Sequence, residues 1–283
     1  MIIVSNLAFS YAKTPFIEHV NLNVSKGEIF GFLGPSGAGK STLQKILTGL
    51  IKTYSGNSVV KGVESKNYNN DFYENIGVDF EFPSLYEKLT GRENLDFFGS
   101  LYSKTLRNKD DLMDMVGLKN DGDKKVSEYS KGMKSRLNFI KALLHNPEIL
   151  FLDEPTSGLD PSNSSIMKNI ILDEKQKGTT IILTTHNMTD AAELCDRVAF
   201  IVDGKVKALD TPHNLIMSKG ATKIKYAYMD MDGVEKTGES LLSKTSADHK
   251  LHELIKNNKI LSIHSSEPTL NDIFIEVTGK VLL

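Results

Sequence analysis

Apolar and polar residues alternate, with the period of a half-buried β-strand, over residues 2–9 and again over residues 16–24. Residues 11–15 between them have the composition of a turn, and residues 55–60 are expected to add a further strand. The start of the chain therefore predicts a small antiparallel β subdomain.

Between residues 90 and 146 the apolar positions follow the spacing of helices instead. Thr90 and Glu93 have the pattern of a capping box, which predicts a helix start. A second helix is expected to carry the apolar positions from Leu106 onward and to stop at Gly117, and a third is expected over residues 131–144. This block predicts an inserted helical subdomain, about residues 90–146.

Short apolar runs alternate with helical patterns from residue 149 onward. Strands are predicted over residues 149–152, 180–184 and 197–202, and helices over residues 161–177 and 189–194. Strands joined by helices in this order favour parallel pairing, with the chemistry at the carboxyl ends of the strands. We therefore predict an α/β fold, a core of mostly parallel sheet with helices, in a domain over residues 1–220.

The composition changes after Gly220, and residues 221–283 predict a small C-terminal α+β appendage. It is expected to contain strands over residues 223–228 and 260–263 and helices over residues 251–255 and 270–277. A chain of 283 residues is longer than one hydrophobic core usually supports, which favours this division. The appendage has no chemical motif of its own.

The composition is that of a globular protein, with 40% hydrophobic and 25% charged residues and a formal net charge of −2. Because basic residues are not in excess, no nucleic-acid partner is expected. The single cysteine, Cys195, fits a reducing compartment. Apolar runs are strand-sized, and residues 1–5 read as a first strand, so we expect a cytoplasmic protein without a membrane span.

Residues 34–41 read Gly-Pro-Ser-Gly-Ala-Gly-Lys-Ser, the phosphate-binding pattern G-x-x-x-x-G-K-[ST] of a P-loop NTPase. The predicted strand over residues 28–33 before it and the predicted helix from Thr42 after it supply the expected context. Backbone N–H groups of such a loop face the phosphates, Lys40 can reach the β- and γ-phosphates, and Ser41 can bind Mg²⁺. A glycine-rich turn with a chance lysine is the alternative, which the flanking elements disfavour. The expected nucleotide-binding residues are Gly34, Pro35, Ser36, Gly37, Ala38, Gly39, Lys40, Ser41 and Thr42.

The predicted strand over residues 149–152 ends in two adjacent carboxylates, Asp153 and Glu154. Where this strand meets the phosphate loop, Asp153 can hold Mg²⁺. Glu154 points to the other side of the chain and is placed to polarise an attacking water. A solvated strand end is the alternative, and the phosphate loop makes it the weaker one.

Residues 129–136, Tyr-Ser-Lys-Gly-Met-Lys-Ser-Arg, complete an ordered set of motifs. The other members of the set are residues 34–41, 149–155, 157–160 and 185–186. In order and spacing, over roughly residues 1–220, the set resembles the nucleotide-binding subunits of ABC transporters. Any one of these motifs alone would indicate only a P-loop NTPase.

The resemblance implies roles for residues on the nucleotide side of the site. Tyr11 would stack on adenine, and His186 would hydrogen-bond the γ-phosphate during catalysis. Glu81 would contact Mg²⁺ at a position where the family usually has glutamine. ATP and Mg²⁺ are the implied substrate and cofactor.

The resemblance also implies contacts between two subunits. Ser130 and Gly132 would contact the γ-phosphate of an ATP held by the other subunit, and Asp160 would lie in the loop that crosses the dimer interface. Ser130 also has the pattern of a helix N-cap, so a hydroxyl and free N–H groups would converge on one anion. Taken without the resemblance, this segment reads as a capped helix with a basic face.

The implied function is hydrolysis of MgATP in a dimer sandwich, homodimeric or heterodimeric, which drives a separate membrane permease. Glu81, Lys131 and residues 267–274 resemble the drug- and antibiotic-export branch, which implies an exporter. The permease would dock against residues 80–89 and the helix after Thr90. The chain would then lie on the inner face of the cell membrane, held there by the permease.

Two other classes of protein share the phosphate loop. A soluble ABC-type ATPase acting on ribosomes or DNA usually carries two tandem nucleotide domains or a long coiled coil, and this chain has neither. A small-molecule kinase would leave Ser130 and Asp160 without a role. The cargo is not specified, because this subunit does not touch it.

Overall fold

Two structural units make up the chain, and they divide between Leu209 and Asp210. The structure is a computed structural model that describes residues 1–280, with the exception of residues 13, 219, 221–222, 231 and 267. Lys13, in the predicted turn, and residues 221–222 and 281–283, at the ends of the predicted appendage, therefore lie outside the described residues. Within the described part of the chain, no helix combines the length and apolar character that crossing a membrane requires.

The first unit begins with the antiparallel sheet that the alternation predicted. Its strands are β1 (Ile2–Phe9), β2 (Ile17–Val24), β4 (Ser55–Val60) and β5 (Val63–Glu64), in the order β2-β1-β4-β5. Ile2 lies opposite Val24 on one side and Val60 on the other, which places the apolar positions of three strands on one face.

A six-stranded sheet forms the centre of the first unit, in the order β10-β9-β3-β8-β7-β6. Strands β3, β7 and β8 are buried at every position, as a sheet covered on both faces requires. The predicted strands are present, and β6 and β10 are additions that the sequence pattern did not indicate. The bounds are β3 (Ile29–Leu33), β6 (Ile76–Asp79), β7 (Ile149–Asp153), β8 (Thr180–Thr185), β9 (Arg197–Val202) and β10 (Lys205–Asp210).

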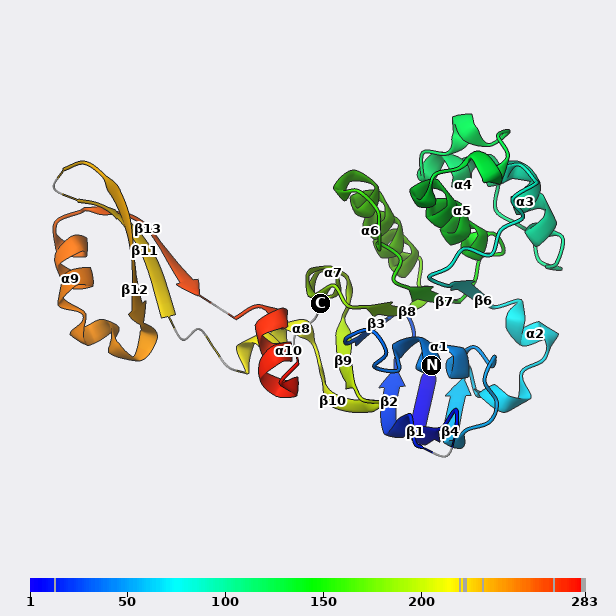
Figure 1. Cartoon of the computed structure of the whole chain (residues 1–283), viewed down its shortest axis with the longest axis horizontal. Coiled ribbons are helices and arrows are strands. Elements are labelled where there is room, and N and C mark those ends of the chain that lie inside the picture. Colours follow the sequence, from blue (N-terminus) through cyan, green and yellow to red (C-terminus); the bar gives the residue numbers. More distant parts are fainter. Residues whose placement is uncertain (13, 219, 221–222, 231, 267, 281–283) are drawn as a thin grey trace. The chain divides into compact units, whose positions relative to one another are not determined.

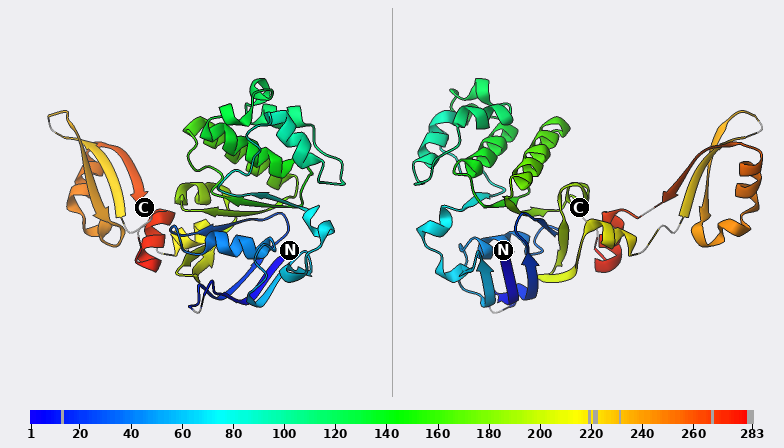
Figure 2. Two further views of the ribbon diagram at one scale, coloured as in Figure 1. Left: turned by 45° about the vertical axis from the view of Figure 1, so that its right-hand side comes forward. Right: turned by 180° about the vertical axis from the view of Figure 1, so that it is seen from behind.

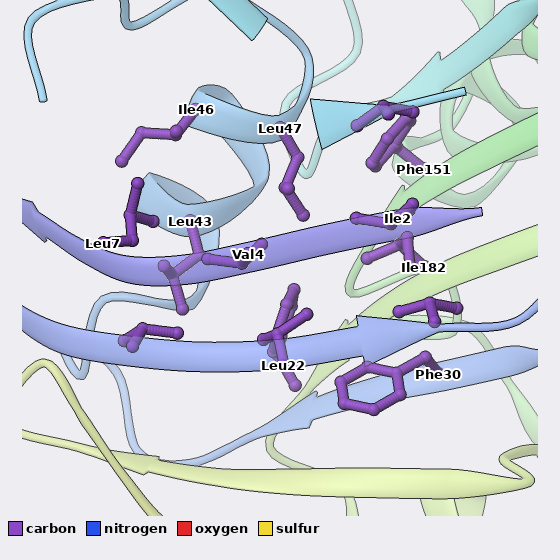
Figure 3. Packing of buried hydrophobic residues seen from close by; sticks show 14 of the residues in the cluster. Ile2, Val4, Leu7, Leu22, Phe30, Leu43, Ile46, Leu47, Phe151 and Ile182 are labelled. Atoms are coloured by element: carbon purple, nitrogen blue, oxygen red, sulfur yellow. The ribbon is translucent and has the colours of Figure 1, made fainter. Parts of the chain in front are cut away.

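Helices and the antiparallel sheet cover the two faces of this central sheet. Helix α1 (Lys40–Leu47) and the antiparallel sheet lie on one side, and α5 (Lys131–Leu143) and α6 (Pro161–Gln176) lie on the other (Figure 1, Figure 2). The core between the sheets contains side chains from β1, β2, α1 and the parallel strands (Figure 3). Among them are Ile2, Val4, Leu22, Phe30, Leu43, Leu47, Phe151 and Ile182.

The helical block between the phosphate loop and β7 is arranged as predicted, with one shifted boundary. Thr90 and Glu93 form the capping box at the start of α3 (Gly91–Gly99). The second helix, α4 (Lys109–Met115), starts after Leu106, because the side chain of Asn108 caps it by accepting from the N–H groups of Asp110 and Asp111. Short helical segments α2 (Asn70–Tyr73), Ser65–Asn67, Lys119–Asp121 and Val126–Glu128 and helix α7 (Met188–Leu194) complete the unit.

The second unit contains a three-stranded antiparallel sheet in the order β12-β11-β13. Tyr226, Tyr228 and Leu251 form its small core, with α9 packed on the sheet. Strand β12 has almost no apolar residues and was not predicted, because its place depends on pairing with β11. The bounds are α8 (Pro212–Met217), β11 (Lys223–Met229), β12 (Glu235–Leu241), the 3-10 segment Leu242–Ala247, α9 (His249–Lys256), β13 (Ile260–Ser266) and α10 (Leu270–Thr278).

Candidate active site

The phosphate-loop residues connect strand β3 to helix α1. Gly39, immediately before α1, has φ = 108°, a left-handed conformation that favours glycine. The helix starts at Lys40, two residues earlier than the expected start at Thr42. Because Gly39 has no side chain to cap α1, the N–H groups of the first turn remain available to a ligand. An open helix N-terminus beside a curled backbone suits a phosphate group.

The ammonium group of Lys40 lies inside this loop. Its Nζ donates to the carbonyl oxygens of Gly34, at 2.7 Å, and Pro35, at 3.1 Å. It also lies 3.9 Å from Glu154 Oε1. Burial lowers the pKa of Lys40, and the nearby carboxylates of Glu154, Asp153 and Glu81 oppose that shift. A buried cation held by carbonyl oxygens can exchange them for phosphate oxygens, which carry more charge.

Asp153 ends β7 directly below the loop. Its Oδ1 accepts a hydrogen bond from Ser41 Oγ at 3.2 Å and another from Thr184 Oγ1. Among the residues that the structure describes, no group of three or more His, Cys, Asp or Glu side chains is arranged to hold a metal ion. Mg²⁺, however, is usually held by one or two carboxylates together with phosphate oxygens and waters. The adjacent oxygens of Ser41 and Asp153 fit that mode of binding.

Glu154 turns away from the line of β7. Its φ of 53° is left-handed, which is strained for a residue with a side chain and is often found at functional sites. Its Oε2 accepts from Thr185 Oγ1 at 3.1 Å, and its Oε1 lies 2.9 Å from His186 Nδ1. The carboxylate is therefore oriented by two residues at the end of β8.

The phosphate loop and the Glu154 carboxylate face one polar hollow of about 210 Å³. The loop lines it from Ser36 to Thr42, and Glu81, Glu154 and His186 line the remainder with Phe16. Phe16 was not among the expected site residues. Its only signal in the sequence is an aromatic side chain at the end of the turn that also contains Tyr11.

Tyr11 lies beside the start of α1. Its hydroxyl shares a hydrogen bond of 2.9 Å with Thr42 Oγ1. The rings of Phe9 and Phe16 contact it edge-on, at centroid distances of 4.7 and 5.3 Å. The Tyr11 side chain is 63% exposed, so its ring is accessible to a flat ligand next to the hollow.

The remaining expected residues do not line this hollow. Ser130 is the N-cap of α5 and accepts from the N–H of Met133 at 3.2 Å, and Gly132 follows in the first turn. Asp160 is the N-cap of α6 and accepts from the N–H groups of Ser162 and Asn163, both at 3.1 Å. Within one chain the structure thus assembles the phosphate loop, Glu81, Asp153, Glu154 and His186, and leaves Ser130, Gly132 and Asp160 outside.

Glu81 also lines a second, smaller hollow with Asp79 and Asn138. Asp79 is buried at the end of β6 and accepts a hydrogen bond from the side-chain amide of Asn138. Burial raises the pKa of Asp79 to about 7, although the Asn138 amide and Lys141 act in the opposite direction. Neither residue could be recognised from the sequence, since a lone Asp and a lone Asn far apart in the chain form no motif.

Comparison with known protein families gives a match over residues 17–157 to the family described as ABC transporter. A fluoroquinolones export ATP-binding protein of Mycobacterium tuberculosis is 47% identical over 281 residues, covering 99% of this chain and 93% of the relative. The bacitracin transport ATP-binding protein BcrA of Bacillus licheniformis is 32% identical, covering 97% of this chain and 96% of the relative.

Solved structures give the same assignment for the fold. The structure of an ATP-binding subunit of an ABC transporter matches 77% of this chain and 93% of its own, with a TM-score of 0.71 and 28% identity. A dimeric bacterial ABC transporter cassette matches 75% of this chain and 98% of its own, with a TM-score of 0.67 and 24% identity. At that identity the second match concerns the fold alone.

Proposed function

This chain belongs to the ABC transporter family as an ATP-binding subunit that hydrolyses ATP, and we propose that it does so with Mg²⁺, in a dimer, to drive export through a separate membrane permease. The observation that supports this proposal is the convergence of the phosphate loop with Glu154 in one hollow, with Asp153 hydrogen-bonded to Ser41 of that loop. The proposal assigns a separate task to each part of that hollow.

The phosphate loop and the first turn of α1 hold the β- and γ-phosphates through their N–H groups, and Lys40 adds a positive charge. Tyr11 offers its exposed ring to adenine. When bound by Ser41 and Asp153, with Glu81 nearby, Mg²⁺ would neutralise charge on the phosphate oxygens. These contacts bind and orient the substrate.

Glu154 is the proposed general base that takes a proton from the attacking water. Its left-handed backbone and its contacts with Thr185 and His186 hold the carboxylate toward the hollow. Since a carboxylate only accepts hydrogen bonds, His186 Nδ1 carries the proton in this contact. Its Nε2 is then the ring nitrogen that is left for a contact with the γ-phosphate.

A second subunit is needed to complete the site. Ser130 and Gly132 lie at an exposed helix N-terminus outside their own hollow, where they can meet the γ-phosphate bound by another subunit. Asp160 lies at the N-terminus of α6, on the loop proposed to cross between the two subunits. The dimeric assembly of a cassette with this fold supports the same arrangement.

The permease is proposed to dock on an apolar surface formed by residues 80–89 and helix α3. Its exposed side chains include Phe82, at 79% exposure, and Tyr86 and Phe97, whose rings are in contact at a centroid distance of 4.7 Å. Exposed apolar side chains that contact one another, as Tyr86 and Phe97 do, typically mark a site of protein association. The names of the relatives, which refer to export of fluoroquinolones and transport of bacitracin, support an exporter over an ATPase of ribosomes or DNA. The subunit would work at the inner face of the membrane, as a homodimer or a heterodimer.

Mixing two inactive variants tests the shared site. Lys40→Ala removes the cation of the phosphate loop, and Ser130→Arg blocks the helix terminus that faces the other subunit. A mixed dimer then contains one doubly damaged and one intact site, so ATPase activity should partly return. Each variant mixed with itself is the control, with circular dichroism and gel filtration to check folding and dimer formation. If the variants fold and form mixed dimers but ATPase activity does not return, the shared site is ruled out.

A further inference from the structure

The side chain of Asn138 joins helix α5 to the end of strand β6. Asn138 is buried, and its Nδ2 donates to the carboxylate of Asp79 and, at 3.3 Å, to the carbonyl oxygen of Phe80. Its Oδ1 accepts from Lys141 Nζ at 2.6 Å. An asparagine amide has two donors and one acceptor oxygen, so every polar group of this side chain has a partner.

Lys141 extends this contact further along the same segment. Its Nζ also donates to the carbonyl oxygen of Ser84 at 3.1 Å and lies 4.6 Å from the centroid of the Phe98 ring. Asn138 and Lys141 thus contact the chain on both sides of Glu81, at Phe80 and at Ser84. Asp79, Asn138 and Lys141 are called the amide clamp below.

Tyr86 and Glu87, further along this segment, also contact the helical block. The backbone N–H of Tyr86 donates to Oδ1 of the buried Asn94 at 2.8 Å, and Asn94 Nδ2 donates to the carbonyl oxygen of Tyr86 at 3.0 Å. Lys134 Nζ contacts Glu87 Oε1 at 2.7 Å, an exposed pair that adds little. Residues 79–87 are therefore held to α5 and α3 at successive points.

The backbones of helix α5 and strand β6 pack closely against each other at Gly77. A Cβ on Gly77 would lie 2.2 Å from the carbonyl oxygen of Ala142, so β6 and α5 approach closely only because residue 77 is glycine. The same helix begins at Ser130, the residue proposed to face the ATP of the other subunit. One rigid element therefore connects that terminus with the segment that contains Glu81.

We propose that Asn138 is a positioning residue, which couples the Ser130 end of α5 to Glu81 so that both approach the phosphates as one body. This inference rests on the proposed function, in which Ser130 and Glu81 serve opposite ATP molecules. The clamp would make each site respond to closure at the other. Without it, residues 79–87 could adjust independently of α5.

Replacing both Asp79 and Asn138 of the amide clamp with apolar side chains tests its positioning role without leaving a buried polar group unpaired at either position. Asp79→Leu/Asn138→Leu removes the buried polar pair together, and such replacements are often neutral for folding. Lys141→Met removes the contacts of the ammonium group with Asn138, Ser84 and the Phe98 ring and preserves the length of the stem. Asp79→Asn keeps an acceptor for the Asn138 amide and serves as the conservative variant. Ser58→Ala, which loses a buried 2.8 Å hydrogen bond to Ser65 in the antiparallel sheet, is the matched control.

We expect kcat to fall by roughly 10- to 100-fold in the double variant and by about threefold in Lys141→Met, because the reacting groups are misplaced. ATP affinity should stay within about twofold, since the phosphate loop is unchanged. Amide hydrogen exchange of residues 79–87 should accelerate relative to α5 in both variants. Asp79→Asn and Ser58→Ala should keep kcat and the exchange pattern.

The outcomes distinguish this inference from the function on which it depends. An unaltered protein without ATPase activity would contradict the proposed function itself. An active protein whose folded clamp variants keep kcat and the exchange pattern of residues 79–87 would overturn the positioning role alone. If the double variant does not fold, Lys141→Met decides the question by the same two measurements.

Discussion

Glu154 Oε1 lies between two nitrogen atoms, 2.9 Å from His186 Nδ1 and 3.9 Å from Lys40 Nζ. The carboxylate is thus held by the histidine at the end of β8 while it faces the cation of the phosphate loop. This position directs the carboxylate into the hollow that the phosphate loop lines. The role of Glu154 in catalysis can therefore be tested apart from its role in the fold.

Glu154→Gln should retain ATP binding and lose hydrolysis. The amide preserves the shape of the side chain but cannot take a proton from water, so the rate should fall by roughly 10²–10⁴-fold. ATP affinity measured by calorimetry should change little, and an ATP-bound dimer should accumulate in gel filtration. Asp173→Asn, at a distant site in α6, is the control. Turnover close to that of the unaltered protein would remove Glu154 from the role of base.

Glu81→Gln should change the metal preference of the ATPase more than its rate. Glu81 lines the hollow with the phosphate loop, and its charge is close enough to Lys40 to favour the protonated lysine. The neutral amide offers an oxygen of the same reach but a weaker ligand for Mg²⁺. Rates measured across Mg²⁺ and Mn²⁺ concentrations should show a shifted metal requirement. Complete loss of activity with both metals would instead make Glu81 an essential carboxylate.

The ion pair between Arg107 and Glu174 should stabilise the attachment of the helical block to α6. Arg107 Nη1 donates to Glu174 Oε1 at 2.8 Å, and the Glu174 side chain is only 4% exposed. Arg107→Met should lower the free energy of unfolding by about 3 kcal/mol, because the carboxylate stays buried with one partner fewer. Lys177 also contacts Glu174, at 2.7 Å, and limits the loss.

Urea unfolding of Arg107→Met, of Glu174→Gln and of the double variant measures this coupling. The double variant should recover most of the stability lost in Arg107→Met. If the two single losses simply add, the pair contributes no coupling and the attachment has another cause. Lys119→Met, at an exposed ion pair with Asp114, should change stability by less than about 1 kcal/mol.

His145 should make the protein less stable in mild acid. Its ring is fully buried, stacks on Tyr102 at 3.8 Å, and has Nε2 2.8 Å from the carbonyl oxygen of Ile76. A carbonyl only accepts, so Nε2 carries the proton, and Nδ1 has no hydrogen-bond partner among the residues that the structure describes. Burial lowers the pKa of His145 to about 4 from 6.5.

Stability falls in acid because the unfolded chain binds a proton at His145 more readily than the folded chain does. Between about pH 6.5 and pH 4 the unfolded chain takes up the proton and the folded chain does not, so stability falls as the pH falls. The contribution is fully present above pH 6.5 and declines by up to about 1.4 kcal/mol per pH unit below it. His145→Gln can keep a donor for Ile76 and should flatten the stability curve in this range. An unchanged slope in that variant would assign the acid sensitivity to other groups.

The sequence predicted those parts of the site that are local in the chain. The phosphate loop and the pair Asp153–Glu154 could be identified because glycines, a lysine and adjacent carboxylates have fixed spacing next to apolar strands. The start of α5 at Ser130 followed from N-cap chemistry. Such features depend on neighbouring residues only.

Features that depend on distant residues could not be predicted. Strand β6 has only four residues, and its place depends on pairing with β7, where Ile76 lies opposite Ile149. The contact of Asn138 with Asp79 spans 59 positions and has no local pattern. Strand β12 lacks an apolar period, and its Gly238 lies against the ring of Tyr226, a contact that only the sheet creates. In each case tertiary pairing decided the structure.

The position of β3 in the central sheet also determines when the site can form during synthesis. Ile29 pairs with Ile181 on one side of β3, and Phe30 pairs with Arg197 on the other. The segment that carries the phosphate loop thus leaves the ribosome long before either of its neighbours exists. Pairing across such separations is slow and leaves apolar strands exposed meanwhile. The first motif to be translated is therefore among the last to become able to hold nucleotide, and a nascent chain interrupted before β8 is a candidate for chaperone capture.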